Sequence, residues 1–305
     1  MPWKFVLSSF FVLITILLLL FYWVIPTNTF GFYEGYGSYS SNFTINGSNS
    51  GMQFYENMRF TGNEISYRIY ECPLQKKYDM ERAFEIISNL TVLEFYETEI
   101  NEEIFITCDS RNKIENNLFI AGEGGPVNIT STNNFNVIFN GQILLIRDSK
   151  CENPNVATHE LLHVLGFDHS LNQGSIMYNI TKCSQRVGED VVGKINNLYS
   201  HPSYSDLVFE NVSANMRGKY LDSNITIKNH GLKDAENIKL KIYADEKLLK
   251  EISVDSVKIG YGLTLTLNNI LVAKININEL KFEISHNSPE LDKENNEIKL
   301  EIKNP

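Results

Sequence analysis

Three of the six histidines in this chain lie close together, in the segment HELLHVLGFDH at residues 159–169. If residues 158–166 form a helix, His159 and His163 project from one face one turn apart, as two ligands of a single ion must. Gly166 accepts a positive φ at little steric cost, so the helix can end there and the chain can turn to bring His169 to the same ion. Three imidazoles leave one tetrahedral position for water, which is the arrangement of a catalytic zinc site.

The competing interpretation is that these histidines are ordinary polar residues on a buried helix, and it is the better one for an isolated pair spaced four apart. However, the five fixed positions of H-E-x-x-H-x-x-G-x-x-H make coincidence a poor explanation. Two buried imidazoles beside the buried carboxylate of Glu160 would also be costly without an ion. We expect burial because apolar residues cover the other faces of the helix: Leu161, Leu162, Val164 and Leu165.

The segments before the histidines predict a mixed sheet with a helix packed on it. Residues 78–90 have apolar residues at helical spacing, at Met80, Phe84, Ile87 and Leu90. Residues 65–71 (ISYRIYE), 92–98 (VLEFYET) and 103–107 (EIFIT) read as short strands. Within residues 136–146, the Asn140–Gly141 pair predicts the tight turn of a hairpin.

The pattern changes after His201 and Pro202. From about residue 211 onward, apolar residues alternate with polar ones in ITI, IKLKI, LTLTL, FEI and IKLEI, separated by NHG, ADE and NNE. Several short strands at this spacing predict a β-sandwich of about a hundred residues. Nothing in this stretch indicates catalysis.

The histidine segment matches the metzincin signature, and SIMY at residues 175–178 matches its Met-turn. The resemblance is closest to the matrixins, because Ser170 follows the third histidine and Tyr178 follows Met177. It extends over about residues 58–200, and CSQRVGEDVVGKINNLY at 183–199 resembles the closing helix of a matrixin catalytic domain. Residues 212–303 resemble the CARDB family of Ig-like domains, which are usually adhesion or spacer modules.

The matrixin resemblance implies a role for each matching residue. His159, His163 and His169 would bind one catalytic zinc ion. Glu160 would be the general base that activates the zinc-bound water, and Met177 would form the floor beneath the metal. Zinc lowers the pKa of its bound water towards neutrality and polarises the scissile carbonyl, while the carboxylate passes the proton to the leaving amine.

Two features depart from the matrixin pattern. Matrixins usually bind a second, structural zinc through upstream histidines, but no histidine precedes His159, so we predict no second zinc. The first cysteine, Cys72, lies within the apparent catalytic domain, so the prodomain cysteine switch of the family is absent. The sequence also gives no support for a structural calcium ion.

The N-terminus predicts a membrane anchor. Residues 5–25 carry no charge and are about long enough to cross a ~30 Å hydrocarbon core as a helix. A cleaved signal peptide is the alternative, but its apolar region is normally about 7–15 residues and ends in small residues, whereas this one ends near Tyr22 and Trp23. Lys4 before the segment favours a cytoplasmic N-terminus. The Gly-, Ser- and Asn-rich residues 27–51 predict a flexible stalk.

All four cysteines follow the anchor, in a compartment where pairing is expected. We predict Cys72–Cys108, because these residues close two strands expected to be neighbours in one sheet. We predict Cys151–Cys183, because that bridge would tie the start of the histidine helix to the segment after the Met-turn. Four free buried cysteines are the alternative.

Together these features predict an α+β fold class. We expect an anchor at 1–26, a stalk at 27–51, a matrixin-like domain with a mixed twisted sheet at 52–205, and a CARDB-like β-sandwich at 206–305. The predicted function is that of a single-pass membrane ectoenzyme, an extracellular zinc endopeptidase acting on peptide or protein substrates, whose C-terminal domain positions it or binds a surface partner. A catalytically inactive adhesion protein is the alternative. A net charge of -10 argues against a nucleic-acid partner.

Overall fold

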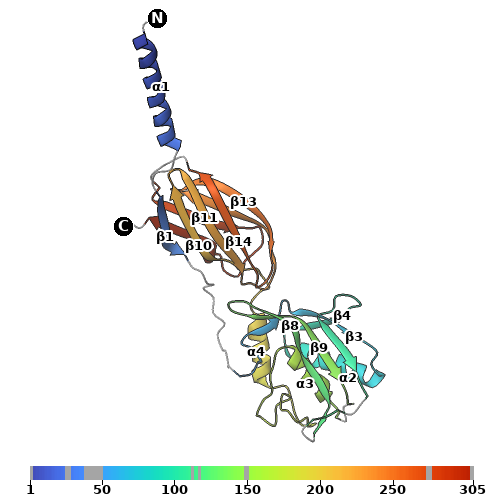
Figure 1. The fold of residues 1–305 in the computed structure, drawn as a ribbon. Coiled ribbons are helices and arrows are strands. Elements are labelled where there is room, and N and C mark those ends of the chain that lie inside the picture. The colour runs from blue at the N-terminus through green and yellow to red at the C-terminus, as the bar shows by residue number, and fades with distance from the viewer. Residues whose placement is uncertain are drawn as a thin grey trace.

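A computed structural model describes residues 3–24, 29–37, 51–110, 113–115, 118–147, 151–272 and 277–302. These residues form a mixed α/β domain and an all-β domain, with one helix at the N-terminus (Figure 1). The predicted fold class is therefore confirmed for the two domains. In Figure 1 the all-β domain lies between the N-terminal helix and the α/β domain.

The α/β domain is built on one twisted sheet with the strand order β2-β9-β5-β3-β4, and β8 pairs with β9 at its edge. All neighbouring strands in this sheet are parallel except β8 and β9. A separate hairpin, β6 and β7, precedes β8. The strand bounds are β2 Met58–Phe60, β3 Glu64–Ile69, β4 Glu94–Glu97, β5 Ile104–Cys108, β6 Lys113–Glu115, β7 Leu118–Ile120, β8 Gly122–Ser131 and β9 Asn136–Leu145.

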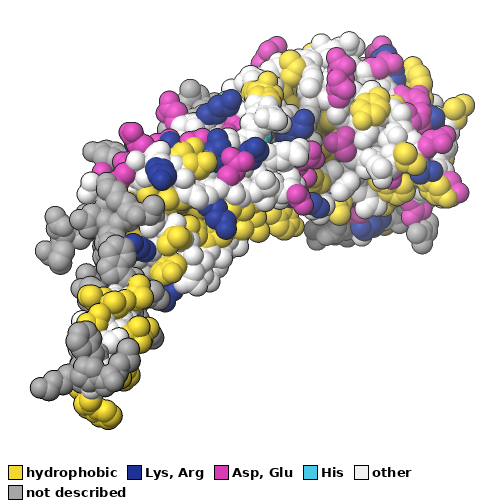
Figure 2. All heavy atoms as spheres, turned by 90° about the horizontal axis from the view of Figure 1, so that it is seen from above, with side chains coloured by type: hydrophobic (Ala, Val, Ile, Leu, Met, Phe, Trp, Pro, Cys, Tyr) yellow, Lys and Arg dark blue, Asp and Glu magenta, His cyan; other side chains and the backbone are white. Residues whose placement is uncertain are grey.

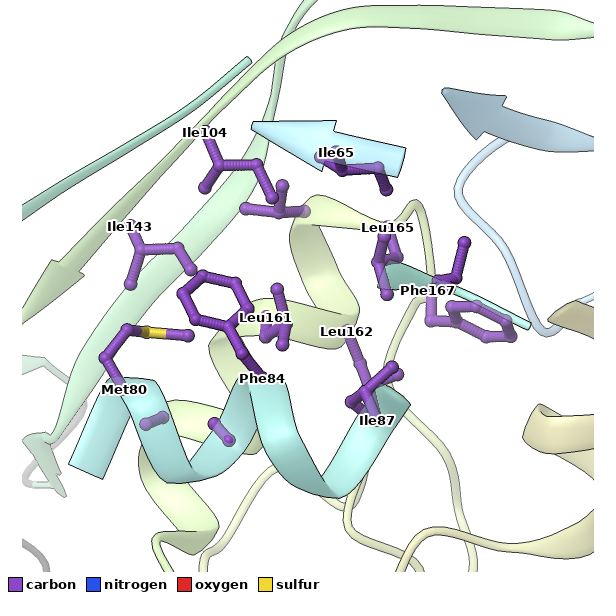
Figure 3. Close-up of a cluster of buried hydrophobic side chains, with 14 of the residues drawn as sticks. Ile65, Met80, Phe84, Ile87, Ile104, Ile143, Leu161, Leu162, Leu165 and Phe167 are labelled. Carbon is purple, nitrogen blue, oxygen red and sulfur yellow. The ribbon is translucent and has the colours of Figure 1, made fainter. Parts of the chain in front are cut away.

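Three helices accompany this sheet: α2 (Leu74–Leu90), α3 (Asn155–Val164) and α4 (Glu189–Tyr199). Met80, Phe84 and Ile87 of α2 are buried and point towards α3 beneath the strands (Figure 3). The predicted apolar stripe of α2 is thus largely confirmed, although Leu90 at its end is 45% exposed. Helix α2 starts one turn earlier than predicted, at Leu74, which is exposed and so gave no apolar signal.

The closing helix α4 is shorter than the resemblance implied, because residues 183–188 are not helical and the helix begins after Gly188. Its C-terminus is tied to β2 by the buried Arg59. The Arg59 guanidinium donates to the carbonyls of Leu198 and His201. Its Cζ atom lies 4.3 Å from the centroid of the Tyr199 ring. A cation suits this position, since the last carbonyls of a helix carry partial negative charge.

The predicted turn at Asn140–Gly141 is wrong. Both residues lie inside β9, which runs without a break from Asn136 to Leu145. Gly141 is needed here for space and not for a turn, because a Cβ at this position would collide with the side chain of Val164 on α3. The actual hairpin turn joins β8 to β9 at residues 132–135.

The all-β domain contains the alternating segments predicted from the sequence. Its buried side chains form one core that draws on every one of the strands from β10 to β16. The strands pair in the order β13-β12-β15-β16-β1-β10-β11-β14, and the loop at 258–261 connects the two end strands. The bounds are β10 Leu207–Arg217, β11 Tyr220–Asn229, β12 Ala235–Ala244, β13 Lys247–Val257, β14 Gly262–Leu271, β15 Glu279–Ser285 and β16 Glu297–Ile302.

The prediction of a flexible stalk at 27–51 is wrong for part of that segment. Residues Thr29–Gly37 form β1, which is antiparallel to β10 on one side and to β16 on the other. Aromatic residues in this stretch suit a strand, but its partners come much later in the chain, so no local pattern announced the pairing. Residues 38–50 of the predicted stalk lie outside the described residues.

The N-terminal segment forms helix α1 (Trp3–Val24). The apolar side chains described between residues 6 and 20 are exposed for most of its length. In the part of the chain that the structure describes, no helix is both long and apolar enough to span a membrane.

A third apolar cluster joins the two domains. Phe135 and Val137 of the β8–β9 hairpin pack against Leu232 and Ile259 from loops of the all-β domain. All four side chains are at least 96% buried, given exposed fractions of 1%, 0%, 1% and 4%. The amide of Asn133 at the hairpin tip also donates to Nδ1 of His230, 3.1 Å away. We call this set of contacts the interdomain cluster.

Disulfide Cys72–Cys108 is present as predicted, with a Cα–Cα distance of 5.1 Å. Its cysteines follow β3 and end β5, which are neighbouring parallel strands. The bridge therefore fixes the start of α2 to the strand beneath it.

Deleting residues 1–37 should destabilise the all-β domain more than deleting residues 1–24. Without β1, the edges of β10 and β16 lose their partner and become free to pair with other chains. We expect the shorter protein to unfold about 5 °C or more below the longer one, and to associate as concentration rises. Scanning calorimetry and gel filtration of both proteins measure this; equal midpoints would contradict the assignment of β1.

Acid should weaken the interdomain cluster through His230. Burial, reinforced by Lys228, lowers the pKa of His230 below its usual 6.5, although Glu210 opposes this. The unfolded chain therefore takes up the proton at higher pH than the folded one, so stability is fully present above pH 6.5 and declines as the pH falls through the lowered value. We expect the pH dependence of the free energy of unfolding below pH 6.5 to be shallower in His230→Gln than in the native chain. Parallel curves would contradict this.

Candidate metal centre

Helix α3 carries two of the three histidines and is buried along its whole length. Leu161, Leu162 and Val164 are fully buried in the core beneath the sheet, which orients the opposite side of the helix towards the surface cleft. The helix ends at Val164, and Gly166 two residues later has φ +92°; a Cβ at Gly166 would lie 2.6 Å from that of Met58. Gly166 is therefore required both for the turn and for the close approach of β2.

The turn brings the three histidines together as predicted. One nitrogen from each of His159, His163 and His169 lies within 4.8 Å of the others. Nε2 of His163 is 2.9 Å from Nε2 of His159 and 3.2 Å from Nε2 of His169. Nitrogen ligands about 2.0–2.1 Å from a tetrahedral ion lie about 3.3 Å apart, so the cluster is close to the size that zinc needs.

Backbone carbonyls fix the protons of two of these rings. Nδ1 of His159 donates to the carbonyl of Ile176 at 2.6 Å, and Nδ1 of His163 donates to that of Phe167 at 2.7 Å. A neutral imidazole protonated on Nδ1 has its lone pair on Nε2. The two Nε2 atoms therefore face each other as acceptors without a proton between them, and a cation would relieve this repulsion.

The electrostatics favour neutral rings. Burial, followed by the neighbouring His159, lowers the pKa of His163 to about 4. Burial is also the main reason that the pKa of His159 is lowered, although its bond to Ile176 opposes the shift. Neutral imidazoles are the form that binds metal, so the donor set fits a zinc ion at neutral pH.

Glu160 lies next to this cluster and its side chain lines the same cleft. It is 6% exposed, and burial, followed by the charge of Glu123, raises its pKa to about 8. A cation held by the three imidazoles would oppose this shift because it favours the carboxylate. The arrangement thus offers a carboxyl group that exchanges a proton near neutrality.

The Met-turn supports the helix from the other side. Met177 is 2% exposed, and its carbonyl accepts from the amide of Ser170, one residue after the third histidine. Its neighbour Ile176 supplies the carbonyl that orients His159. Met177 is therefore a packing residue within the segment that holds two parts of the cluster in register.

Disulfide Cys151–Cys183 is also present as predicted, with a Cα–Cα distance of 5.1 Å. The side chain of Asn155 at the start of α3 donates to the carbonyl of Lys182, 2.7 Å away. Both links join the beginning of the histidine helix to the segment that follows the Met-turn.

Strand β8 borders the cleft and approaches α3 very closely. A Cβ on Gly122 would lie 2.8 Å from Cγ of Glu160, and one on Gly124 would collide with the carbonyl of Glu160. Glycine at both positions is what allows the strand to lie against the helix. Gly122 and Gly124 were not among the site residues expected from the sequence, although the pattern GEGG (122–125) is typical of a strand that another backbone approaches closely.

The cleft has a volume of about 700 Å³. One of its walls is Phe54, whose ring stacks on His163 with 5.6 Å between centroids, and which no sequence pattern indicated. The lining residues are Phe54, Ile120, Ala121, Gly122, Glu123, Gly124, Arg147, His159, Glu160, His163, His169, Asn179, Ile180 and Thr181.

Comparisons with known proteins agree with both resemblances. The family model of the matrixins matches residues 59–200, and the CARDB family model matches residues 205–300. A search of curated proteins found no match. Among solved structures, the chain is similar to the CARDB domain of a Pyrococcus furiosus protein in complex with di-metal ions. That similarity has 18% identity and a TM-score of 0.28, and it covers 32% of this chain and 87% of that one.

Gly124→Ala should damage the centre while Gly125→Ala should not. The added methyl at 124 collides with the backbone of Glu160, so either β8 or α3 must move, whereas a Cβ at 125 meets no atom within 4 Å. We expect Gly124→Ala to lower the free energy of unfolding by about 1–3 kcal/mol, and Gly125→Ala to change it by less than about 0.5 kcal/mol. Chemical denaturation and zinc titration of both variants provide the test; similar values for the two would contradict it.

Proposed function

Because residues 59–200 form a matrixin domain and residues 205–300 a CARDB domain, we propose that this chain is a zinc-dependent endopeptidase acting on extended polypeptides. The matrixin domain supports a metallopeptidase-like hydrolase. The observation that carries the proposal is the convergence of the imidazoles of His159, His163 and His169 beside the buried carboxyl group of Glu160. Zinc bound there would lower the pKa of a water molecule and polarise the scissile carbonyl.

In this proposal Glu160 is the general base. It is not needed as a ligand, since three imidazoles already leave one open position. Its burial raises the affinity of its carboxylate for a proton, which favours removal of a proton from the attacking water. The same group then delivers that proton to the leaving amine.

The substrate is proposed to be an extended peptide because of β8. This strand pairs with β9 on one side, and no strand of the described chain pairs with its other edge. Gly122, Glu123 and Gly124 on β8 line the cleft beside Glu160. A free strand edge offers backbone donors and acceptors to a peptide chain without selecting its side chains. Internal bonds of a long chain can therefore be presented to the centre.

Membrane attachment is part of the proposal. The apolar side chains of α1 contact little of the protein, which is a costly arrangement in water. No helix in the described part of the chain is long and apolar enough to span a membrane, so the proposal that α1 anchors the chain, with the two domains outside the cell and the all-β domain as a spacer, rests on these exposed side chains. The two disulfides suit an oxidising compartment. Figure 2 shows acidic and basic side chains intermixed on the visible face, which gives a nucleic acid no basic patch there.

Glu160→Gln should abolish hydrolysis while zinc binding persists. The amide cannot accept the proton, so we expect kcat on a denatured protein substrate to fall about 10²–10⁴-fold, with about one zinc still bound per chain. Steady-state kinetics and elemental analysis of the purified protein measure the two quantities. A chelator should remove the activity of the native chain, and added zinc should restore it.

The matched control is Glu85→Gln, which makes the same chemical change on the exposed surface of α2. It should match the native chain in rate and zinc content. A Glu160→Gln variant as fast as Glu85→Gln would refute the assignment of the base. Zinc binding by a native chain that hydrolyses nothing would instead favour an inactive adhesion protein.

A further inference from the structure

The interdomain cluster lies at the far end of the strand that borders the cleft. Gly122 and Gly124 at the start of β8 contact the metal-centre helix, and Ser131 at its end leads into the hairpin tip, residues 132–135. Phe135 in this tip is 1% exposed and packs in one cluster with Leu232 and Ile259 of the other domain. One strand therefore runs from the metal centre to the all-β domain.

The hairpin tip is held from several directions. The ring of Phe135 packs with Leu232 and Ile259, and it meets His201 of the interdomain linker edge-on at 6.0 Å. Thr130, next to the tip, lies so close to Gly260 that no Cβ would fit there. These contacts come from three separate segments of the chain, at 201, 232 and 259–260, so the hairpin tip is enclosed by residues from all three.

Strand β8 lacks the support that an interior strand has. Among the strands that the structure describes, β9 alone pairs with it, and the register of that pairing shifts between Pro126 and Asn128 and again between Asn128 and Ile129. Pro126 also has no amide proton to donate. Since the ladder is interrupted in its middle, the position of β8 depends on what holds its two ends.

We propose that the all-β domain positions β8 beside the metal centre through Phe135, Leu232 and Ile259, so that the second domain belongs to the machinery that binds substrate. The effect of this positioning of β8 on catalysis rests on the proposed function. A strand edge that pairs with a peptide must be held to about 0.5 Å, and loosening its far end lowers the fraction of molecules that are ready to bind. Phe135, Leu232 and Ile259 are positioning residues in this arrangement and touch no substrate.

The test is a substitution in the all-β domain, at a position outside the α/β domain that holds the candidate metal centre. Ile259→Asp places a carboxylate in the interdomain cluster. Ile259 lies in a loop of the all-β domain and is not part of that domain's own core. The matched control is Leu271→Asp, a change of the same kind at a 64% exposed position at the end of β14. Thermal unfolding of both variants verifies that the all-β domain stays folded.

The first readout is amide hydrogen exchange, which does not depend on activity. We expect the amides of β8 to exchange about tenfold faster in Ile259→Asp, while those of β3 and β5 keep their native rates. Leu271→Asp should match the native chain throughout. Unchanged exchange in β8 would overturn the proposal, whether or not the protein proves to be a protease.

The second readout is the division between KM and kcat. For a peptide long enough to lie along β8, we expect Ile259→Asp to raise KM about fivefold and to leave kcat within about twofold, because uniform binding is lost while the centre is intact. A two-residue substrate, which is too short to extend along β8, should be cleaved at the native rate. Equal decreases in kcat/KM on both substrates would show that Ile259→Asp damages the protein generally, and would overturn the positioning role. If the native chain shows no chelator-sensitive hydrolysis, the proposed function fails, and the exchange result alone decides the positioning of β8.

Discussion

The metal centre depends on two carbonyl oxygens that fix where the histidine protons lie. Ile176 and Phe167 each accept a hydrogen bond from Nδ1 of a ring, so the Nε2 lone pairs of His159 and His163 point to one place. Both carbonyls belong to segments that follow the helix. Three features bring the chain after α3 back against that helix. They are the turn at Gly166, the Met-turn and the Cys151–Cys183 disulfide. A cation between the converging lone pairs would relieve their repulsion.

A second constraint is the small distance between α3 and β8. Glycines at 122, 124 and 141 remove the side chains that would separate the helix from the strands, and the result is a nearly dry carboxyl group at Glu160. Burial has a chemical effect here because it disfavours the charged form of Glu160 and the protonated forms of His159 and His163. The same packing thus prepares the rings to bind metal and the carboxyl group to exchange a proton.

The path of the chain connects this packing to the second domain. The chain contributes β1 to the all-β domain, leaves it to form the α/β domain, and returns as β10, which is the neighbour of β1. The α/β domain is thus an insertion between two adjacent strands of the other domain. The buried Arg59 donates a hydrogen bond to the carbonyl of Leu198 at the end of α4, and its Cζ atom lies 5.8 Å from the centroid of the Phe135 ring. The two domains consequently share buried structure as well as a covalent connection.

The sequence by itself determined the histidine cluster, because its determinants are local. A spacing of four on a helix places His159 and His163 on one face in any surroundings, and a glycine after the helix permits the turn to His169. The cysteine pairing also followed, since Cys72 and Cys108 close two strands expected to be neighbours, and Cys151 and Cys183 flank the histidine helix and the Met-turn. Tertiary structure alone decided the rest. Asn140–Gly141 has the composition of a turn, yet the space beside Val164 makes it the middle of a strand. Residues 29–37 lack an alternating pattern, but β10 and β16 satisfy their backbone groups from far along the chain. Phe135 reads as an ordinary loop residue until the second domain surrounds it, because the energy of burial depends on what lies opposite and not on neighbours in the sequence.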